Sequence, residues 1–340
     1  MKTLLTALME SLSAGRPTVL VTVVASSGST PRGTGARMLV GEAGRITGTI
    51  GGGAVEYRST QMAQEALAAK SSYTNAFRLT KDDVANLGMI CGGDVLVFFQ
   101  YIAGDRRDVL GVVKAALAMC DMDEDAWLIT ETTGESSWSM GAYSRSKGLV
   151  GLSDCPKELA DILNKPVVKT EIDGRRFYCE QFATAGRVII FGCGHVAQEL
   201  APVLSHLDFR VVALDDRPQF ACRELFPTAD YVGPVDFTRI ADSIAITGND
   251  YVCIMTRGHS HDTDVQKQVL RTDAYYVGVM GSRHKMAAVA KLLIEDGLTQ
   301  EAVDRIHTPI GTAIKAQTPA ELAISIAGEL IMMRAEKNGL

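Results

Sequence analysis

Residues 186–216 read GRVIIFGCGHVAQELAPVLSHLDFRVVALDD and carry the clearest indication of how this chain folds. The short apolar run at residues 188–191 is typical of a parallel strand that is covered on both faces. It leads into a G-x-G-x-x-A pattern at residues 192–197, then into apolar residues at helical spacing, and then into a second apolar run at residues 211–214. Strand, glycine turn, helix and strand in this order predict a dinucleotide-binding βαβ unit.

Three residues of this unit are candidates for contact with a nucleotide. Gly192 and Gly194 would let the backbone come close to a pyrophosphate, because free N–H groups at the start of the helix point towards it. Asp215 follows the second strand, where a carboxylate can accept hydrogen bonds from a ribose diol. The alternative interpretation is that the glycines only permit tight packing of strand against helix.

The composition excludes several classes of protein. A length of 340 residues suggests two domains, and a net charge of −6 without a long Lys/Arg run argues against nonspecific nucleic-acid binding. No uninterrupted apolar run reaches the length of a membrane span. The seven cysteines are scattered and form no C-x-x-C pair, which argues against a structural zinc site or a disulfide framework. We therefore expect a cytoplasmic protein.

The first half of the chain contains two candidate anion-binding segments. A strand at residues 19–25 is followed by a loop rich in hydroxyls and glycine, in which Ser29 and Arg32 could bind an anion. A hairpin at residues 36–50 then leads to three consecutive glycines at the start of a helix predicted over 54–70, namely Gly51, Gly52 and Gly53. Their N–H groups could face a phosphate or an oxyanion. The alternative is a flexible joint between strand and helix.

Among the cysteines, Cys91 is the best candidate for a functional residue, because neighbouring glycines would let a ligand approach it. A thiolate at this position could bind a soft metal or hold sulfur. The alternative is a small buried hydrophobic side chain, which is common for cysteine.

The rest of the first half suggests an internal duplication. Residues 127–134 and the hairpin that follows them loosely resemble residues 20–28 and their hairpin. We place the domain boundary at residues 180–185. This gives a first domain over residues 1–180 and a second over residues 186–340.

Two further strands of the second half end in polar residues. The strand predicted at residues 251–255 leads to Arg257 and His259, which could bind an anionic ligand, or in the case of histidine transfer a proton near neutral pH. In an extended backbone His259 and His261 would face one side, so a metal pair completed by Asp262 is an alternative.

The next strand, at residues 275–280, ends just before Ser282 and Arg283 at the start of a helix. A hydroxyl and a cation at a helix start predict another anion site. A simple surface helix cap is the alternative.

The chain resembles the XdhC/CoxI family of accessory proteins for molybdenum-containing hydroxylases. The resemblance rests on motifs that occur in order along nearly the whole chain: GSTPR at 28–32, GARM at 35–38, GTIGGG at 48–53, CGG at 91–93, GCGHVA at 192–197, GVMGSR at 278–283, PIG at 309–311 and TPAELA at 318–323.

The resemblance implies a protein that binds molybdenum cofactor, as molybdopterin or its dinucleotide form. Such a protein shields the cofactor while its terminal sulfur is added, and delivers it to a molybdenum hydroxylase such as xanthine dehydrogenase. It also implies a homodimer, with a sulfur-donating cysteine desulfurase as a further partner. The contacts that it implies are Ser29, Arg32, Gly51, Gly52, Gly53 and Cys91, the last as a molybdenum or sulfur contact, and the crevice around Gly192, Gly194 and Arg283.

The sequence therefore predicts an α/β protein, with an N-terminal mixed α/β domain followed by a Rossmann-like doubly wound parallel sheet. A cofactor-insertion factor is favoured over an enzyme, because no complete catalytic constellation is visible. Two alternatives stay open. One is an NAD(P)-dependent oxidoreductase that uses the C-terminal crevice with His259, His261 or His284 as proton donor. The other is a metal-dependent enzyme that uses His259, His261 and Asp262.

Overall fold

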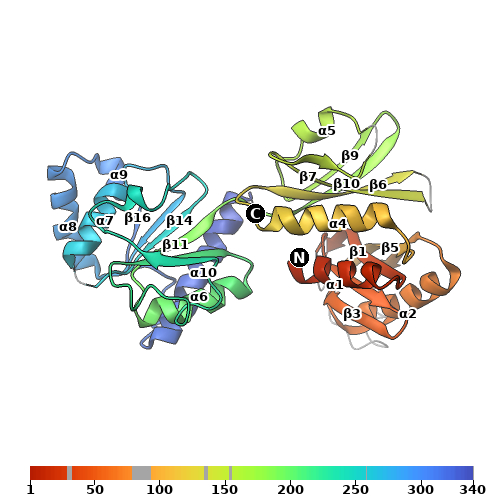
Figure 1. Ribbon diagram of the computed structural model, residues 1–340, viewed down its shortest axis with the longest axis horizontal. Coiled ribbons are helices and arrows are strands. Elements are labelled where there is room, and N and C mark those ends of the chain that lie inside the picture. Colours follow the sequence, from red (N-terminus) through yellow and green to blue (C-terminus); the bar gives the residue numbers. More distant parts are fainter. Residues whose placement is uncertain (29–32, 79–92, 134–136, 153–154, 258, 340) are drawn as a thin grey trace. The chain divides into compact units, whose positions relative to one another are not determined.

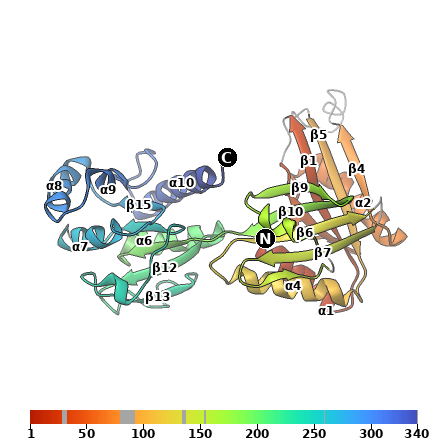
Figure 2. The ribbon, with the colours of Figure 1, turned by 90° about the horizontal axis from the view of Figure 1, so that it is seen from above.

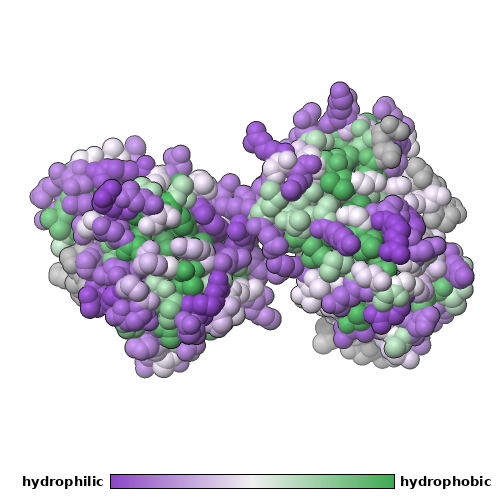
Figure 3. Space-filling model, viewed as in Figure 1, coloured by the Kyte–Doolittle hydropathy of each residue, from purple (hydrophilic) through white to green (hydrophobic). Residues whose placement is uncertain are grey.

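The computed structural model describes residues 1–28, 33–78, 93–133, 137–152, 155–257 and 259–339 (Figure 1). The chain divides into two compact units, Met1–Thr184 and Ala185–Leu340. On the face shown in Figure 3, polar side chains cover much of the surface of each unit, and smaller apolar patches interrupt this polar surface. Among the described residues, none of the helices combines the length and the apolar composition that a membrane-crossing helix needs.

The first unit consists of two repeats with the same order of elements. The first repeat contains α1 (Lys2–Ser13), β1 (Thr18–Gly28), β2 (Arg37–Gly41), β3 (Gly44–Thr49), α2 (Gly53–Ala69), β4 (Tyr73–Arg78) and β5 (Gly93–Ile102). The second contains α4 (Arg107–Cys120), β6 (Ala126–Thr133), β7 (Ser137–Ser144), β8 (Gly148–Val150), α5 (Glu158–Asp161), β9 (Val167–Ile172) and β10 (Arg175–Ala183).

The two five-stranded antiparallel sheets of these repeats have equivalent strand orders, β3-β2-β1-β5-β4 and β8-β7-β6-β10-β9. In each sheet the first strand of the repeat is central and pairs with the second and the fifth. This equivalence confirms the internal duplication that the sequence suggests.

A shared core joins the two repeats. Helices α1 and α4 pack against each other (Figures 1 and 2). Their apolar faces meet Leu20 and Leu39 of the first sheet and Leu128 and Ala142 of the second in one cluster. Helix α2 covers the opposite face of the first sheet, and α5 that of the second. Each sheet is therefore buried on its outer face by its own helix, and on part of its inner face by α1 and α4.

The second unit contains a parallel sheet with helices on both faces. Its strand order is β13-β12-β11-β14-β15-β16, and the described pairs are parallel. Its strands are β11 (Arg187–Phe191), β12 (Arg210–Asp215), β13 (Tyr231–Pro234), β14 (Tyr251–Ile254), β15 (Tyr276–Val279) and β16 (Ile306–His307). Its α-helices are α6 (His195–His206), α7 (His259–Val269), α8 (Arg283–Glu295), α9 (Gln300–Asp304) and α10 (Pro319–Lys337).

The helices of the second unit form two cores on opposite faces of this sheet. Side chains of α6 and α10 pack on one face, and those of α7 and α8 on the other. Consecutive residues of β11 alternate between the two cores, with Ile190 in the first and Phe191 in the second, which explains why the strand is apolar throughout. The predicted doubly wound, Rossmann-like sheet is confirmed.

Candidate functional site

The carboxyl edge of the second unit's sheet carries most of the C-terminal candidate residues. Strands β11, β14 and β15 are parallel neighbours, so Gly192, Arg257 and Ser282, which follow their carboxyl ends, lie along the same edge. The chain turns outward in opposite directions from β11 and β14, and open α/β sheets bind ligands at such a switch point. Arg257 and Ser282 are exposed. His259 and Arg283 are the first residues of α7 and α8.

The two glycines after β11 have different roles. Gly192 has φ +109°, and a Cβ on it would clash with the carbonyl oxygen of Met255. Gly194 caps the start of α6 with φ −76°, and a Cβ there would meet no atom within 4 Å. Gly192 therefore serves packing against the end of β14. Gly194 leaves open space at a helix start, where the backbone can approach a ligand.

These geometries predict opposite outcomes for two similar substitutions. We expect Gly192→Ala to destabilise the second unit by roughly 2–3 kcal/mol, because alanine is strained at this φ and its methyl group meets backbone. Gly194→Ala should change stability by about 1 kcal/mol at most, since only the cap preference is altered. Differential scanning calorimetry of the two variants checks both values. Equal destabilisation by the two substitutions would contradict the assignment.

Asp215 is buried and accepts hydrogen bonds from within the chain. Its Oδ2 accepts from the Cys193 N–H at 2.7 Å and from Arg217 Nη2 at 3.0 Å. Its Oδ1 accepts from Arg217 N at 3.0 Å and Nε at 2.8 Å. Burial acts to raise the pKa of Asp215, but these hydrogen bonds outweigh it and hold the pKa below its ordinary value. The carboxylate therefore fixes the glycine turn to the end of β12, and its contact with a ribose stays a prediction.

A shallow pocket of about 420 Å³ lies at the next residue, Asp216. It is lined by Asp216, Asp236 and Ser243, among others. From the sequence, the adjacent acids Asp215 and Asp216 favour an unphosphorylated ribose over a 2′-phosphate by charge alone. Two carboxylates favour the hydroxyl groups of a neutral diol over a phosphate.

The expected arrangement of the histidines after β14 is wrong. Residues 259–269 form helix α7 rather than extended backbone, and residues two apart on a helix do not face the same side. Asp262 is buried, and its Oδ1 accepts from the N–H and the hydroxyl of Thr256 at 3.0 and 2.6 Å. The His261 ring packs beside Phe237. Across the described residues, no group of three or more His, Cys, Asp or Glu side chains could hold a metal ion.

In the first unit, a carboxylate of the chain occupies the glycine turn before α2. Glu56 Oε2 accepts from the N–H groups of Ile50 and Gly52 at 3.0 and 3.1 Å and from the hydroxyl of Thr49, and Oε1 pairs with Arg45 at 2.7 Å. Burial acts to raise the pKa of Glu56, but these donors outweigh it and lower the pKa. Part of the anion site expected at Gly51, Gly52 and Gly53 is therefore filled by Glu56, which an incoming anion would have to displace.

Ser29, Arg32 and Cys91 lie outside the described residues. The strands that border them are in register, because Gly28 of β1 pairs with Gly93 of β5.

The cysteines that the structure describes are all free thiols. Burial raises the pKa of the Cys179 and Cys193 thiols to about 12, and it also raises that of Cys253. These three thiols are protonated at neutral pH and are poor metal ligands in that state.

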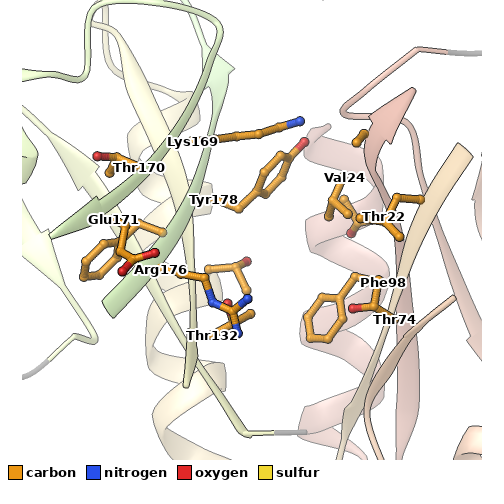
Figure 4. Close-up of a pocket in the computed structure, with 14 residues that line it drawn as sticks. Thr22, Val24, Thr74, Phe98, Thr132, Lys169, Thr170, Glu171, Arg176 and Tyr178 are labelled. Carbon is orange, nitrogen blue, oxygen red and sulfur yellow. The ribbon is translucent and has the colours of Figure 1, made fainter. Parts of the chain in front are cut away.

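Sequence reasoning missed a cavity of about 490 Å³ between the inner faces of the two sheets of the first unit (Figure 4). Its walls come from β1, β4 and β5 on one side and from β6, β9 and β10 on the other. The alternating polar residues of these strands were a signal for it. However, the pairing of the two faces depends on tertiary structure.

Comparisons with known proteins match both units. A family model described as "XdhC and CoxI family" matches residues 11–77, and one described as "XdhC Rossmann domain" matches residues 188–330. A relative from Bacillus subtilis (strain 168), named as a probable xanthine dehydrogenase subunit, is 24% identical over 98% of this chain and 97% of its own length. The "molybdenum cofactor insertion chaperone PaoD" of Escherichia coli (strain K12) is 21% identical over 98% of this chain and 88% of its own length.

A solved structure also matches almost the whole chain. It is a crystal structure described as a xanthine dehydrogenase from Bacillus halodurans, with a TM-score of 0.77 and 25% sequence identity. The match covers 97% of this chain and 95% of the other.

Proposed function

Because this chain belongs to the XdhC and CoxI family, we propose that it binds the molybdenum cofactor and delivers it to a molybdenum hydroxylase such as xanthine dehydrogenase. The observation that carries the proposal is the family match in both units, in the order first domain and Rossmann domain. Two relatives that align with 98% of the chain support it, since one carries the name of a xanthine dehydrogenase subunit, while the other is named as a cofactor insertion chaperone.

The chemistry of the cargo suits the residues at the carboxyl edge of the second unit. Molybdenum cofactor carries a phosphate. Gly194 offers open space at a helix start after β11, and Arg257 is exposed after the neighbouring strand β14. Together with Ser282 these residues would bind the anionic end of the cofactor and release it without covalent chemistry.

The other predicted contacts in this unit are His259 and Arg283. Ser29, Arg32 and Cys91 remain the predicted contacts in the first unit, and a homodimer and a sulfur-donating desulfurase belong to the same proposal.

The geometry of Asp215 does not favour the oxidoreductase alternative. An enzyme that binds NAD in a Rossmann crevice uses this carboxylate to accept from the ribose. A carboxylate has about four lone-pair positions, and here four N–H donors of Cys193 and Arg217 already point at it. A ribose would have to displace some of them.

Anaerobic purification of the full chain from cells that make the cofactor tests the proposal. We expect molybdenum and pterin to co-purify in comparable amounts and the purified protein to activate a cofactor-free hydroxylase. Arg257→Gln should lower the molybdenum content several-fold, because a charge-assisted contact to the phosphate is lost.

Arg239→Gln is the matched control, since Arg239 is an exposed arginine of the same unit that pairs with Asp242. It should leave the molybdenum content unchanged. Protein without molybdenum or pterin that instead binds and turns over NAD(H) or NADP(H) would overturn the proposal.

A further inference from the structure

The space between the two sheets of the first unit is filled in one part and hollow in another. Around Leu20 and Leu128, helices α1 and α4 pack the inner faces into a continuous core. The neighbouring part is the cavity of about 490 Å³ (Figure 4). Facing sheets normally interdigitate their side chains at close-packed density. Here the two inner faces stay apart and leave an open cleft, in which lining residues such as Leu96 and Lys169 are exposed. Its volume lies in the range of small-molecule sites.

The walls of the cavity are equivalent rows of the two repeats. In the first sheet, Thr22 lies two residues beyond Leu20 on β1. It pairs across the strands with Phe98 of β5, which in turn pairs with Thr74 of β4. Two residues beyond Leu128, Thr130 pairs with Tyr178 and Tyr178 with Lys169. The rows Thr22–Phe98–Thr74 and Thr130–Tyr178–Lys169 therefore occupy the same places in the two sheets and face one another.

The two rows differ in their chemistry. Figure 4 shows Phe98 on one wall and Tyr178 on the other, with Lys169 extending towards the opposite sheet. Arg176, in the next register position of β10, also lines the cavity, and its neighbour across the strands is Glu171. The first sheet thus supplies an apolar wall with a ring and hydroxyls, and the second supplies a ring and two cations against one carboxylate.

This combination selects a ligand class. Aromatic rings on opposite walls favour a flat conjugated ligand, and buried threonine hydroxyls can bond to its ring nitrogens and oxygens. Lys169 has no ion-pair partner among the described residues, and it lines this cavity in a chain whose net charge is −6. A cation in that position favours an anionic substituent on the ligand.

We propose that the cavity between the two repeats binds a flat heteroaromatic anion. If the proposed function holds, this ligand is the pterin portion of the molybdenum cofactor with its anionic dithiolene, and this identification rests on that function. The Tyr178 ring packs against the ligand and is fixed in place, because its hydroxyl donates to Glu180 at 3.3 Å. Lys169 and Arg176 bind the anionic group, and Phe98 and Leu96 pack against the ring.

Titration of the full chain with pterin-6-carboxylate, followed by its fluorescence, tests the cavity directly. We expect saturable binding that weakens about tenfold in Lys169→Gln and in Arg176→Gln, since each removes a charge-assisted contact. Leu96→Trp should abolish binding. Leu96 is 37% exposed and lines the cavity, so tryptophan can fill the space without entering the core.

The controls distinguish recognition of the ligand's negative charge from recognition of its ring. Arg58→Gln removes an exposed arginine of α2, outside the cavity lining, and should bind like the unaltered protein. The neutral 6-methylpterin should bind more weakly and should not respond to the lysine or arginine substitution. Circular dichroism confirms that each variant is folded. Absence of binding, or equal binding by the unaltered protein and Leu96→Trp, would overturn the inference.

Failure of this inference and failure of the proposed function give different results. If Leu96→Trp co-purifies with as much molybdenum and pterin as the unaltered protein, the cavity is not the cofactor site, although the proposed function stands. If the unaltered protein binds pterin-6-carboxylate in the cavity but acquires no molybdenum, the ligand class stands and the proposed function fails.

Discussion

Replacement of Asp250 by alanine is expected to lower the free energy of unfolding of the second unit by about 3–5 kcal/mol. The Asp250 side chain is fully buried and pairs with Arg187 at 2.8 Å. Its oxygens also accept from the Arg187 N–H and Nε, both at 3.0 Å, and from the N–H and hydroxyl of Thr247 at 2.8 and 3.1 Å. Alanine would leave these donors unsatisfied, with a guanidinium among them.

Differential scanning calorimetry measures this loss. Asp242→Ala is the matched control, because Asp242 also pairs with an arginine of the second unit but both side chains are more than half exposed. Surface pairs of this kind contribute little, so this variant should unfold at nearly the unaltered temperature. Equal shifts in the two variants would contradict the assigned role of Asp250.

The lowered pKa of Asp250 predicts that the stability of the second unit depends on pH. Burial acts to raise the pKa of Asp250, but the hydrogen bonds from Arg187 and Thr247 outweigh it and hold the pKa below its ordinary value. A carboxyl whose pKa is lower in the folded state stabilises that state above its unfolded pKa, and this contribution is lost as the pH falls through the folded pKa. The difference in stability between the unaltered protein and Asp250→Asn should therefore shrink on acidification below about pH 4.

Replacement of Arg37 by methionine is expected to have a similar effect on the first unit. Arg37 of β2 and Glu180 of β10 form a buried ion pair of 2.9 Å that joins the two sheets, with side-chain exposures of 3% and 10%. Burial raises the pKa of Glu180, and Arg37 opposes that rise. Arg37→Met leaves the carboxylate buried and uncompensated, which should lower the free energy of unfolding by about 3–5 kcal/mol.

A double substitution tests whether the pair itself is responsible. Arg37→Met combined with Glu180→Gln removes both charges and keeps an acceptor for Tyr178, so much of the lost stability should return. Unfolding can be followed by tryptophan fluorescence, because Trp127 and Trp138 both belong to the first unit. A double variant less stable than Arg37→Met alone would show that the coupling is not electrostatic.

Local patterns in the sequence were sufficient to predict the Rossmann-like sheet of the second unit and the duplication in the first. The βαβ signature at residues 186–216 predicted β11, α6 and β12, because apolar runs, a glycine turn and helical spacing are all encoded within a few residues of each other. The similarity of residues 20–28 and 127–134 predicted the duplication, because equivalent strands need equivalent apolar alternation.

The candidate site was harder to predict because its contacts connect residues far apart in the chain. Glu56 and Asp215 both accept from the N–H groups of glycine turns, but nothing in the motif indicates that the chain's own carboxylates take these donors. Alternation along β10 indicates that Tyr178 and Arg176 share a face, yet it cannot identify the opposing sheet. The start of α7 was missed because polar residues there fit an extended loop as well as a helix.

The core shared by α1 and α4 has a consequence for how the first unit can be dissected. The stretch matched by the "XdhC and CoxI family" model, residues 11–77, contains neither α4 nor β5, the neighbour of β1. Truncation to that stretch would expose to water the leucines that the second repeat covers, and would leave β1 with an unpaired edge. The smallest autonomous module for recombinant expression is therefore the whole of Met1–Thr184, which should unfold as one cooperative body.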